Sequence, residues 1–322
     1  MKSGATLGKW LDMPLGGSKA TWRRFWKDSA LAYLFLLPAI VILGTFSFYP
    51  VIKAFIMSLY EWKALSPEHT YIGLANYQEL FRGFFDFSKD HEFRRAVWNT
   101  LVYIAGTVPI EIGLALGIAL LLNRKLRFRS MYRLAFFTPY VTTVVAVAII
   151  WRWIYDENYG LLKQILGWFH IASPKWLLDP HWSMFTIIVV AIWKSLGYTT
   201  VIYLAGLQNV DKELMNAAKV DGATSSQAFR HVTWPLLSPT TFFVAITSLI
   251  GAFKVFTEIF VLYGGEPGKG RSALTIVYFI VEQARDRYDL GFASAAGYVL
   301  FLMVIAVTLV QLWYAKRHVH YD

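Results

Sequence analysis

The sequence predicts an all-α polytopic membrane protein with about six transmembrane helices. Of its 322 residues, 56% are hydrophobic and only 16% are charged, whereas a soluble domain averages about 45–50% apolar and about 25% charged residues. The apolar residues gather in long runs that carry almost no charge and are apolar on all sides. Such runs favour spanning helices over barrel strands, which alternate with period two. A water-soluble globular protein, a disordered chain and a fibrous protein are therefore excluded.

Six runs approach the roughly 20 apolar residues that a spanning helix needs. They cover residues 31–49, 97–122, 134–150, 184–207, 241–263 and 293–314. A seventh stretch, 274–281, is too short to cross, and we expect it at the membrane interface. The first run follows the polar arm and lacks a small-residue cleavage site, so it is expected to be an uncleaved anchor. We expect one membrane domain over 30–315, between a polar arm, 1–29, and a tail, 316–322.

The distribution of charge predicts the orientation of the spans. With six spans both termini share a side, and the segments on that side carry 16 Lys and Arg against 6 acids, while the opposite side carries 12 against 13. Cytoplasmic loops carry the excess of Lys and Arg, so both termini are predicted to be cytoplasmic. The strongest signal is the run 124–133, with five basic residues and no acid. The formal net charge of +10 is thus explained by sidedness and indicates no nucleic-acid partner.

A polar loop, 208–239, separates the fourth and fifth predicted spans on the cytoplasmic side. Asp211 is suited to cap a helix N-terminus, and Gly222 to stop that helix in the left-handed conformation. Thr224 and Gln227 have the spacing of a capping box, which predicts a second short helix through Val232. Two prolines, at 235 and 239, are expected to end it before the next span. On local physics alone, this segment is an ordinary capped connector.

The loop also resembles a known signature. Its residues Ala217, Ala218, Asp221, Gly222 and Ala223, followed by Phe229, Pro235 and Pro239, resemble the EAA loop of binding-protein-dependent ABC import permeases. Further similarity to the carbohydrate-importer permeases lies in Leu36-Leu37-Pro38-Ala39, Tyr49-Pro50, Gly73-Leu74-Ala75-Asn76-Tyr77, Leu120-Leu121-Leu122-Asn123, Thr138-Pro139, Gly251-Ala252-Phe253 and Gly264-Gly265. The match is closest to the first of the two permeases in maltose-type and glycerol-phosphate-type importers.

This resemblance implies a type I ABC importer permease fold in the bacterial cytoplasmic (inner) membrane. The chain would form half of the pore, beside a second homologous permease subunit, in contact with membrane lipid. An extracytoplasmic solute-binding protein would deliver the substrate. Two cytoplasmic ATPase subunits would bind ATP and Mg²⁺, so that this chain itself binds no cofactor. The loop 208–239 would dock on an ATPase as a coupling helix.

The same resemblance implies which residues couple the loop to the ATPase. They are Glu213, Asn216, Ala217, Ala218, Asp221, Gly222 and Ala223. The glutamate of the family's EAA motif falls on Asn216, while Glu213 lies one helical turn earlier. We expect Gly222 to set the turn geometry and Asp221 to hold it, the alternative for both being simple capping.

Four ionisable residues stand inside the predicted spans: Glu111, Lys194, Lys254 and Glu258. A charge at mid-bilayer costs about 2.5–3.5 kcal/mol on insertion scales, so such groups face protein or a watery cavity. Thr247, Gly251, Lys254 and Glu258 share one helix face by their spacing, and Lys194 and Tyr198 lie one turn apart. We expect these six to line the substrate path, since in the resembling family these two spans carry the sugar contacts. Alternatively, Lys254 and Glu258 neutralise each other at i,i+4, and Glu111 is expected to pack against a neighbouring helix.

The lysines at 194 and 254 also indicate the class of substrate, because an ammonium group favours a uronate or phosphate over a neutral sugar. The unmatched Lys194 leads to the hypothesis of an acidic carbohydrate.

Catalytic chemistry is not indicated: the chain has no cysteine, no HExxH or GxSxG pattern and no other metal-ligand spacing. Two other functions would leave different signs in the sequence. An ion-coupled secondary transporter would show paired repeats and broken helices, and neither is visible in the sequence. A membrane enzyme acting on lipid-linked sugars would need clustered carboxylates at the water boundary, whereas the outer acids are scattered.

Overall fold

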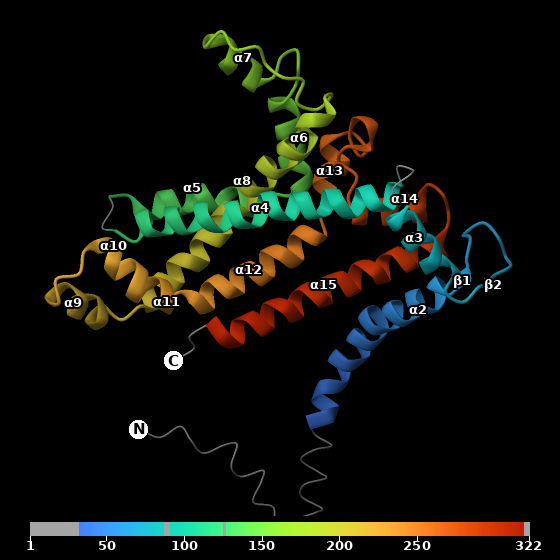
Figure 1. Cartoon of the computed structure of the whole chain (residues 1–322), viewed down its shortest axis with the longest axis horizontal. Helices are drawn as coiled ribbons and strands as arrows, with labels where there is room; N and C mark the ends of the chain where they lie inside the picture. Colours follow the sequence, from blue (N-terminus) through green and yellow to red (C-terminus); the bar gives the residue numbers. More distant parts are fainter. Residues whose placement is uncertain (1–31, 87–90, 125–126, 319–322) are drawn as a thin grey trace, which may run out of the picture. The chain divides into compact units, whose positions relative to one another are not determined.

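A computed structural model describes residues 32–86, 91–124 and 127–318. The predicted arm 1–29 and most of the tail 316–322 lie outside these residues. The chain divides into two compact units, Met1–Ile56 and Met57–Asp322, and each is described by itself. Figure 1 shows the chain coloured along its sequence.

The described part of the first unit is one apolar helix. The helix runs Ala32–Ser58, so its last two residues belong to the second unit, and it ends nine residues beyond the predicted end at 49. Its middle is a π-helical turn, Gly44–Phe48 (η2), in which the Tyr49 N–H donates to the Gly44 carbonyl, and α2, Tyr49–Ser58, continues from there. Pro50 cannot donate a hydrogen bond and crowds the preceding turn. A π turn directly before it lets the helix pass the proline without ending.

The second unit contains a small sheet and the remaining helices. Its elements are β1 (Tyr60–Glu61), β2 (Thr70–Tyr71), α3 (Ala75–Phe85), α4 (Glu92–Leu122), α5 (Arg129–Val141), α6 (Val144–Ile154), α7 (Leu161–Trp168), α8 (Pro180–Asn209), α9 (Lys212–Val220), α10 (Ser225–Ala228), η3 (Phe229–Thr233), α11 (Trp234–Leu236), α12 (Ser238–Phe253), α13 (Thr257–Leu262), η4 (Lys269–Arg271), α14 (Ile276–Arg285) and α15 (Leu290–His318). The strands pair antiparallel, with Tyr60 opposite Tyr71.

Four described helices are long and apolar enough to cross a membrane, and the number reaches six if each of two bent helix pairs counts as one span. The predicted span 134–150 is wrong as a single helix. It comprises α5 and α6, which meet at an angle of 99°. Thr142 and Thr143 have extended backbones at the break, and Thr143 caps α6 by accepting a hydrogen bond from the Ala146 N–H at 3.4 Å.

The predicted span 241–263 is also interrupted. α12 ends at Phe253 and α13 begins at Thr257. A break at membrane depth is tolerated only where protein or a water-filled cavity satisfies the freed backbone groups. Here the Thr275 hydroxyl donates to the Val255 carbonyl at 3.0 Å. The prediction of one continuous helix over 241–263 is therefore wrong, and no sign of this break is visible in the sequence.

The short stretch 274–281 becomes the start of α14 and is buried in protein. Ile276 and Phe279 are 0% and 2% exposed, and the Ile276 N–H donates to the Thr100 hydroxyl on α4 at 3.0 Å. Tertiary packing therefore determines its place.

The helices α4 and α8 pack against each other along their length. One buried cluster joins Phe93 and Tyr103 of α4 to Ile187 and Val190 of α8. A second joins the C-terminal half of α4 to Tyr203, Leu204 and Leu207 of α8 and to Val244 of α12. The three helices thus form the frame on which the polar sites are built.

The loop between α8 and α12 lies at one end of the second unit, beside the start of α5, and α3 and α14 lie at the other end (Figure 1). Its second helix does not end at Val232 as predicted. It continues through η3 and α11 to Leu236, and the chain then bends by 63° into α12. Pro235 lies one residue before the end of this helix, whereas Pro239 sits in the first turn of α12, where a missing N–H costs nothing. Pro239 therefore starts the next helix.

Candidate functional site

A cavity of about 380 Å³ opens between α4, α5, α8 and the broken pair α12–α13. Its lining residues are Tyr103, Thr107, Glu111, Tyr140, Ala191, Lys194, Ser195, Tyr198, Thr247, Ser248, Gly251, Ala252, Lys254, Val255 and Glu258. All six residues predicted for the substrate path are among them. The structure therefore brings together side chains that are up to 64 positions apart in the sequence.

The predicted single helix face holds only in part. Thr247 and Gly251 lie on α12 and Lys254 is its C-cap, but Glu258 lies on α13, beyond the break. A straight helix would have carried all four residues along one line. The break instead places two helix ends at the cavity.

Each of these helix ends carries a side-chain charge that the helix dipole stabilises. Lys254 stands at the C-terminus of α12 and Glu258 in the first turn of α13. The partial negative charge of a helix C-terminus favours a cation, and the partial positive charge of an N-terminus favours an anion. Among the described residues no ion pair joins Lys254 to Glu258, so the geometry does not support their mutual neutralisation.

Lys194 is held by an aromatic pair. Its Nζ donates to the Tyr140 carbonyl at 3.3 Å and lies 5.3 Å from the centre of the Tyr140 ring. That ring stacks on Tyr198, with centroids 4.4 Å apart and an interplanar angle of 10°. A cation over an aromatic face is attracted to the ring electrons. The ammonium group thus has a fixed position in the cavity without a carboxylate partner among the described residues.

Glu111 joins three helices at the cavity wall. It lies on α4 and is only 3% exposed. The Thr199 hydroxyl of α8 donates to its Oε1 at 2.5 Å, and the Ser248 hydroxyl of α12 donates to the same atom at 3.3 Å. Glu111 therefore packs against neighbouring helices as predicted, and it also lines the cavity, which was not predicted.

Sequence reasoning missed several lining residues, and for some of them a signal exists. Tyr103, Thr107 and Glu111 recur at intervals of four on α4, which is a polar stripe of the kind that identified Thr247 and Gly251. Ser248 follows Thr247 directly and carried no such signal. Tyr140 could not be found by spacing, because its position depends on how α5 approaches α8.

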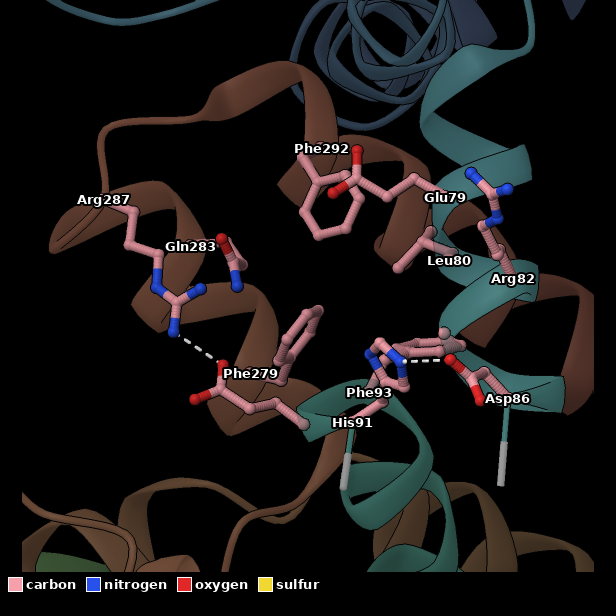
Figure 2. Close-up of a pocket in the computed structure, with 12 residues that line it drawn as sticks. Glu79, Leu80, Arg82, Asp86, His91, Phe93, Phe279, Gln283, Arg287 and Phe292 are labelled. Atoms are coloured by element: carbon pink, nitrogen blue, oxygen red, sulfur yellow. Dashed lines mark hydrogen bonds and ion pairs between the residues drawn. The ribbon is translucent and has the colours of Figure 1, made fainter. Parts of the chain in front are cut away.

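A second pocket, of about 590 Å³, lies at the opposite end of the unit from the loop, between α3, α14 and the starts of α4 and α15. Figure 2 shows the rings of Phe93, Phe279 and Phe292 among the charged side chains that also line the pocket. Gln283, which is 3% exposed, turns its amide toward the pocket. No residue of this pocket was predicted.

An ion-pair network borders this pocket. Glu92 pairs with Arg287 at 2.6 Å and with Arg271 at 3.2 Å, and Arg271 also pairs with Glu282. The hydrogen bond that Arg271 donates to the Glu282 carboxylate raises the pKa of Arg271. Burial opposes this shift, and the negative charges of Glu282 and Glu92 add to it. At the other side of the pocket His91 lies 3.5 Å from Asp86. These contacts fix the start of α4 against α14.

The loop 208–239 has the caps that its sequence predicts. The Asp211 carboxylate accepts a hydrogen bond from the Glu213 N–H at 2.8 Å. Thr224 and Gln227 form a complete capping box, in which the Gln227 side chain accepts from the Thr224 N–H at 2.8 Å. Each cap supplies partners for amide groups that a helix N-terminus leaves unpaired.

The turn after α9 is a Schellman motif centred on Gly222. The Ala223 N–H donates to the Ala218 carbonyl at 2.9 Å, and the Gly222 N–H donates to the Lys219 carbonyl at 3.1 Å. Gly222 has φ +78°, as this motif requires of its left-handed residue. Asp221 is the C-cap residue, and its side chain makes no hydrogen bond among the described residues, so the backbone holds this turn.

Most predicted coupling residues face outward. Glu213, Asn216, Ala217, Asp221 and Gly222 are exposed, whereas Ala218 and Ala223 are half-buried in the turn. Two apolar side chains also project from α9: Val220 is 87% and Leu214 48% exposed. A short, doubly capped helix therefore presents an apolar and small-residue surface at this end of the unit.

Comparisons with known proteins identify relatives for nearly the whole chain. Residues 112–319 match the family described as binding-protein-dependent transport system inner membrane component. The arabinooligosaccharides transport system permease protein AraP of Bacillus subtilis is 34% identical over 303 residues, which are 93% of each chain.

Two solved structures share the fold. A chain of a bacterial ABC transporter involved in the import of the acidic polysaccharide alginate matches with a TM-score of 0.79 at 25% identity, over 91% of this chain and 99% of its own. A second structure, of a bacterial alginate ABC transporter in complex with an alginate pentasaccharide-bound periplasmic protein, matches equally well, over 98% of its own chain.

Proposed function

Because this chain belongs to the family of binding-protein-dependent transport system inner membrane components, and is a permease subunit of a carbohydrate ABC importer, we propose that the cavity between α4, α8 and α12–α13 is its half of the substrate path. Members of this family are transport subunits, not enzymes, and nucleotide binding belongs to a separate ATPase. The observation that carries the proposal is the meeting of two helix ends, with Lys254 and Glu258, at this cavity. Transporters commonly bind substrate where helices are interrupted.

The proposal also covers the partner proteins of this chain and the side of the membrane that each of its ends faces. A second permease subunit would supply the other half of the path, and a solute-binding protein would deliver substrate on the side of α3 and α14. The solved structure with a periplasmic protein bound supports such a partner. The loop 208–239 would face the cytoplasm together with the basic run 124–133, as the positive-inside rule requires.

The loop is proposed to couple ATP hydrolysis to the cavity. Its exposed surface, Val220 and the Ala217 region, would dock on an ATPase subunit. The Schellman turn and the capping box keep α9 and α10 from fraying, so a push on the loop is transmitted to α12 through η3 and α11. Asn216, which replaces the family's glutamate, would make an uncharged contact there.

We further propose that the substrate is an acidic carbohydrate. Lys194 and Lys254 both face the cavity without a carboxylate partner among the described residues, and a desolvated ammonium group favours a uronate or phosphate. The stacked rings of Tyr140 and Tyr198 offer an apolar surface to a sugar ring. The similarity to an alginate importer supports this class of substrate.

The test is uptake by the reconstituted transporter carrying Lys194→Gln, Lys254→Gln or both. We expect uptake of acidic oligosaccharides to fall by at least about tenfold, since a charge-assisted hydrogen bond contributes about 1.5–3 kcal/mol, while uptake of neutral oligosaccharides changes little. Lys163→Gln, on the exposed face of α7, is the matched control. Equal losses for both classes of sugar would contradict the acidic substrate.

A further inference from the structure

Two arginines of the basic run stand side by side at the loop end of the second unit. Arg129 and Arg133 lie one turn apart on α5. With the Gln208 amide in the orientation that satisfies its surroundings, its oxygen accepts from Nη2 of Arg133 at 3.1 Å and from Nη2 of Arg129 at 3.2 Å. The Nε atoms of both guanidinium groups are buried without a hydrogen-bond partner.

This arrangement leaves the positive charges of the Arg129 and Arg133 guanidinium groups without a negative partner among the described residues. Like charges at such a distance repel each other, and more strongly where water is partly excluded. Gln208 offers only a neutral acceptor, and no carboxylate pairs with either arginine among the described residues. The positive end of the α5 dipole lies in the same place and adds to the unfavourable potential. An anion bound between the two groups would remove this repulsion.

A cavity is present next to the pair. It measures about 600 Å³ and is lined by Asn123, Arg129, Leu207, Gln208, Val210, Met215 and Thr233. One wall is thus polar and cationic, and another is apolar. The apolar side chains of the lining are Leu207, Val210 and Met215. A ligand with an anionic head and an apolar continuation fits both surfaces.

We propose that this pocket binds a phosphate group, held between Arg129 and Arg133 with Gln208, and that the phosphate belongs to an anionic phospholipid of the cytoplasmic leaflet. Guanidinium groups bind phosphate oxygens through paired, charge-assisted hydrogen bonds, and basic pockets between membrane helices on the cytoplasmic side bind lipid headgroups. A free phosphate would use the same contacts but would leave the apolar side chains of Leu207, Val210 and Met215 uncovered.

The proposed phosphate site also contacts the loop that is proposed to couple ATP hydrolysis to transport. Met215 lies on α9 and Thr233 ends η3, and the Thr233 hydroxyl donates to the Met215 sulfur at 3.5 Å. Both residues line the pocket, so a bound headgroup would brace the loop against α5 and α8. This consequence depends on the proposed function, whereas binding of the phosphate group does not.

The test measures lipid binding by the purified, complete transporter. We would compare thermal stabilisation and lipid retention with phosphatidylglycerol, with phosphatidylcholine and with inorganic phosphate, for the wild type and for Arg129→Gln/Arg133→Gln. The matched control is Arg124→Gln/Arg127→Gln, which removes the same charge from exposed positions of the same segment. Since sugar uptake is measured separately, failure of this proposal is distinguishable from failure of the import function.

The expected result is that phosphatidylglycerol binds at least about tenfold more weakly to Arg129→Gln/Arg133→Gln, while the control pair keeps wild-type affinity. Stabilisation by inorganic phosphate alone, lost in the same variant, would retain the phosphate site and overturn its lipid source. An equal loss in both variant pairs, or no loss in either, would overturn the site. Should Arg129→Gln/Arg133→Gln fail to fold, Arg129→Lys/Arg133→Lys keeps the charge but not the paired geometry, and intermediate binding is expected.

Discussion

Gly222 holds the turn between α9 and α10 in a conformation that other residues adopt at a cost. Its φ of +78° lies in the left-handed region, where a Cβ approaches the following carbonyl and costs about 1–2 kcal/mol. Space is not the constraint, because a Cβ at this position would meet no atom within 4 Å. The requirement comes from the backbone alone.

We therefore expect Gly222→Ala to lower the coupling of ATP hydrolysis to transport. The strain would loosen the Schellman turn, and α9 would transmit less of the ATPase movement. Gly270→Ala is the matched control, since Gly270 has φ +64° and equally open surroundings but lies far from the loop. Both variants should lose a similar amount of stability in thermal unfolding, and only Gly222→Ala should uncouple transport. Equal transport in the two variants would contradict the lever role of the loop.

Gly197 serves a different purpose, since it allows α8 to approach α5. A Cβ at this position would overlap the Phe136 carbonyl and lie 2.9 Å from the Phe137 Cα. These are backbone atoms and cannot rotate away. The contact stands one residue before Tyr198 and close to Tyr140, so it sets the distance across which the two rings stack.

Gly197→Ala is expected to separate α5 from α8. Overpacking typically costs about 1–3 kcal/mol, and a clash with backbone lies at the upper end of that range. Thermal unfolding in detergent should show a melting temperature several degrees lower, together with loss of sugar uptake. Gly113→Ala on α4 meets no atom within 4 Å and should be silent in the same assay. A Gly197→Ala variant as stable as the wild type would show that the close approach is not required.

At the scale of the element, local sequence patterns predicted the helix caps correctly but did not predict where the spanning helices break. Asp211, Gly222 and the Thr224–Gln227 box were all predicted and are confirmed, because each cap is a bond between residues at most six positions apart. The break at 254–256 was not predictable, because Thr275, some twenty residues away, supplies the partner for the freed Val255 carbonyl. The 99° bend between α5 and α6 likewise depends on packing that no local pattern reveals.

The N-cap residue of α8 is Asp179, whose carboxylate titrates at acid pH. Asp179 caps α8 by accepting from the His181 N–H at 3.0 Å, and this bond, followed by that to the His181 side chain, lowers the pKa of Asp179 below its ordinary value of 3.8. A lowered pKa means that the cap stabilises the folded state above the ordinary pKa. That contribution is lost as the pH falls through the folded-state pKa.

We predict that the melting temperature of the wild type falls below about pH 4, in part because the Asp179 carboxylate is protonated. Asp179→Asn keeps an acceptor for the cap but cannot titrate, so its acid profile should be flatter in this range. Glu68→Gln, at an exposed position of another loop, should follow the wild type. Parallel profiles for wild type and Asp179→Asn would show that this cap contributes no pH dependence.

At the scale of the whole molecule, the cavity was predictable in composition but not in shape. Six of its residues were predicted from charged groups within apolar runs and from the helical spacing around them, since a buried charge is costly and marks function. Tyr140 was not found, because its place beside Lys194 results from how two distant helices meet. The second pocket, shown in Figure 2, was not predicted either, since its residues come from four segments with no common period.

The most direct test is the accessibility of the cavity from each side of the membrane. The chain has no cysteine, and a side chain at Gly251 would meet no atom within 4 Å, so Gly251→Cys introduces a single reactive thiol into the cavity. In the assembled transporter, a membrane-impermeant thiol reagent should label it from the cytoplasmic side without nucleotide and from the outer side when ATP is bound but not hydrolysed. Gly117→Cys, on an open face of α4 outside the cavity, should show no such change of side. Labelling of Gly251→Cys from the same side in both states would contradict the cavity as the path of transport.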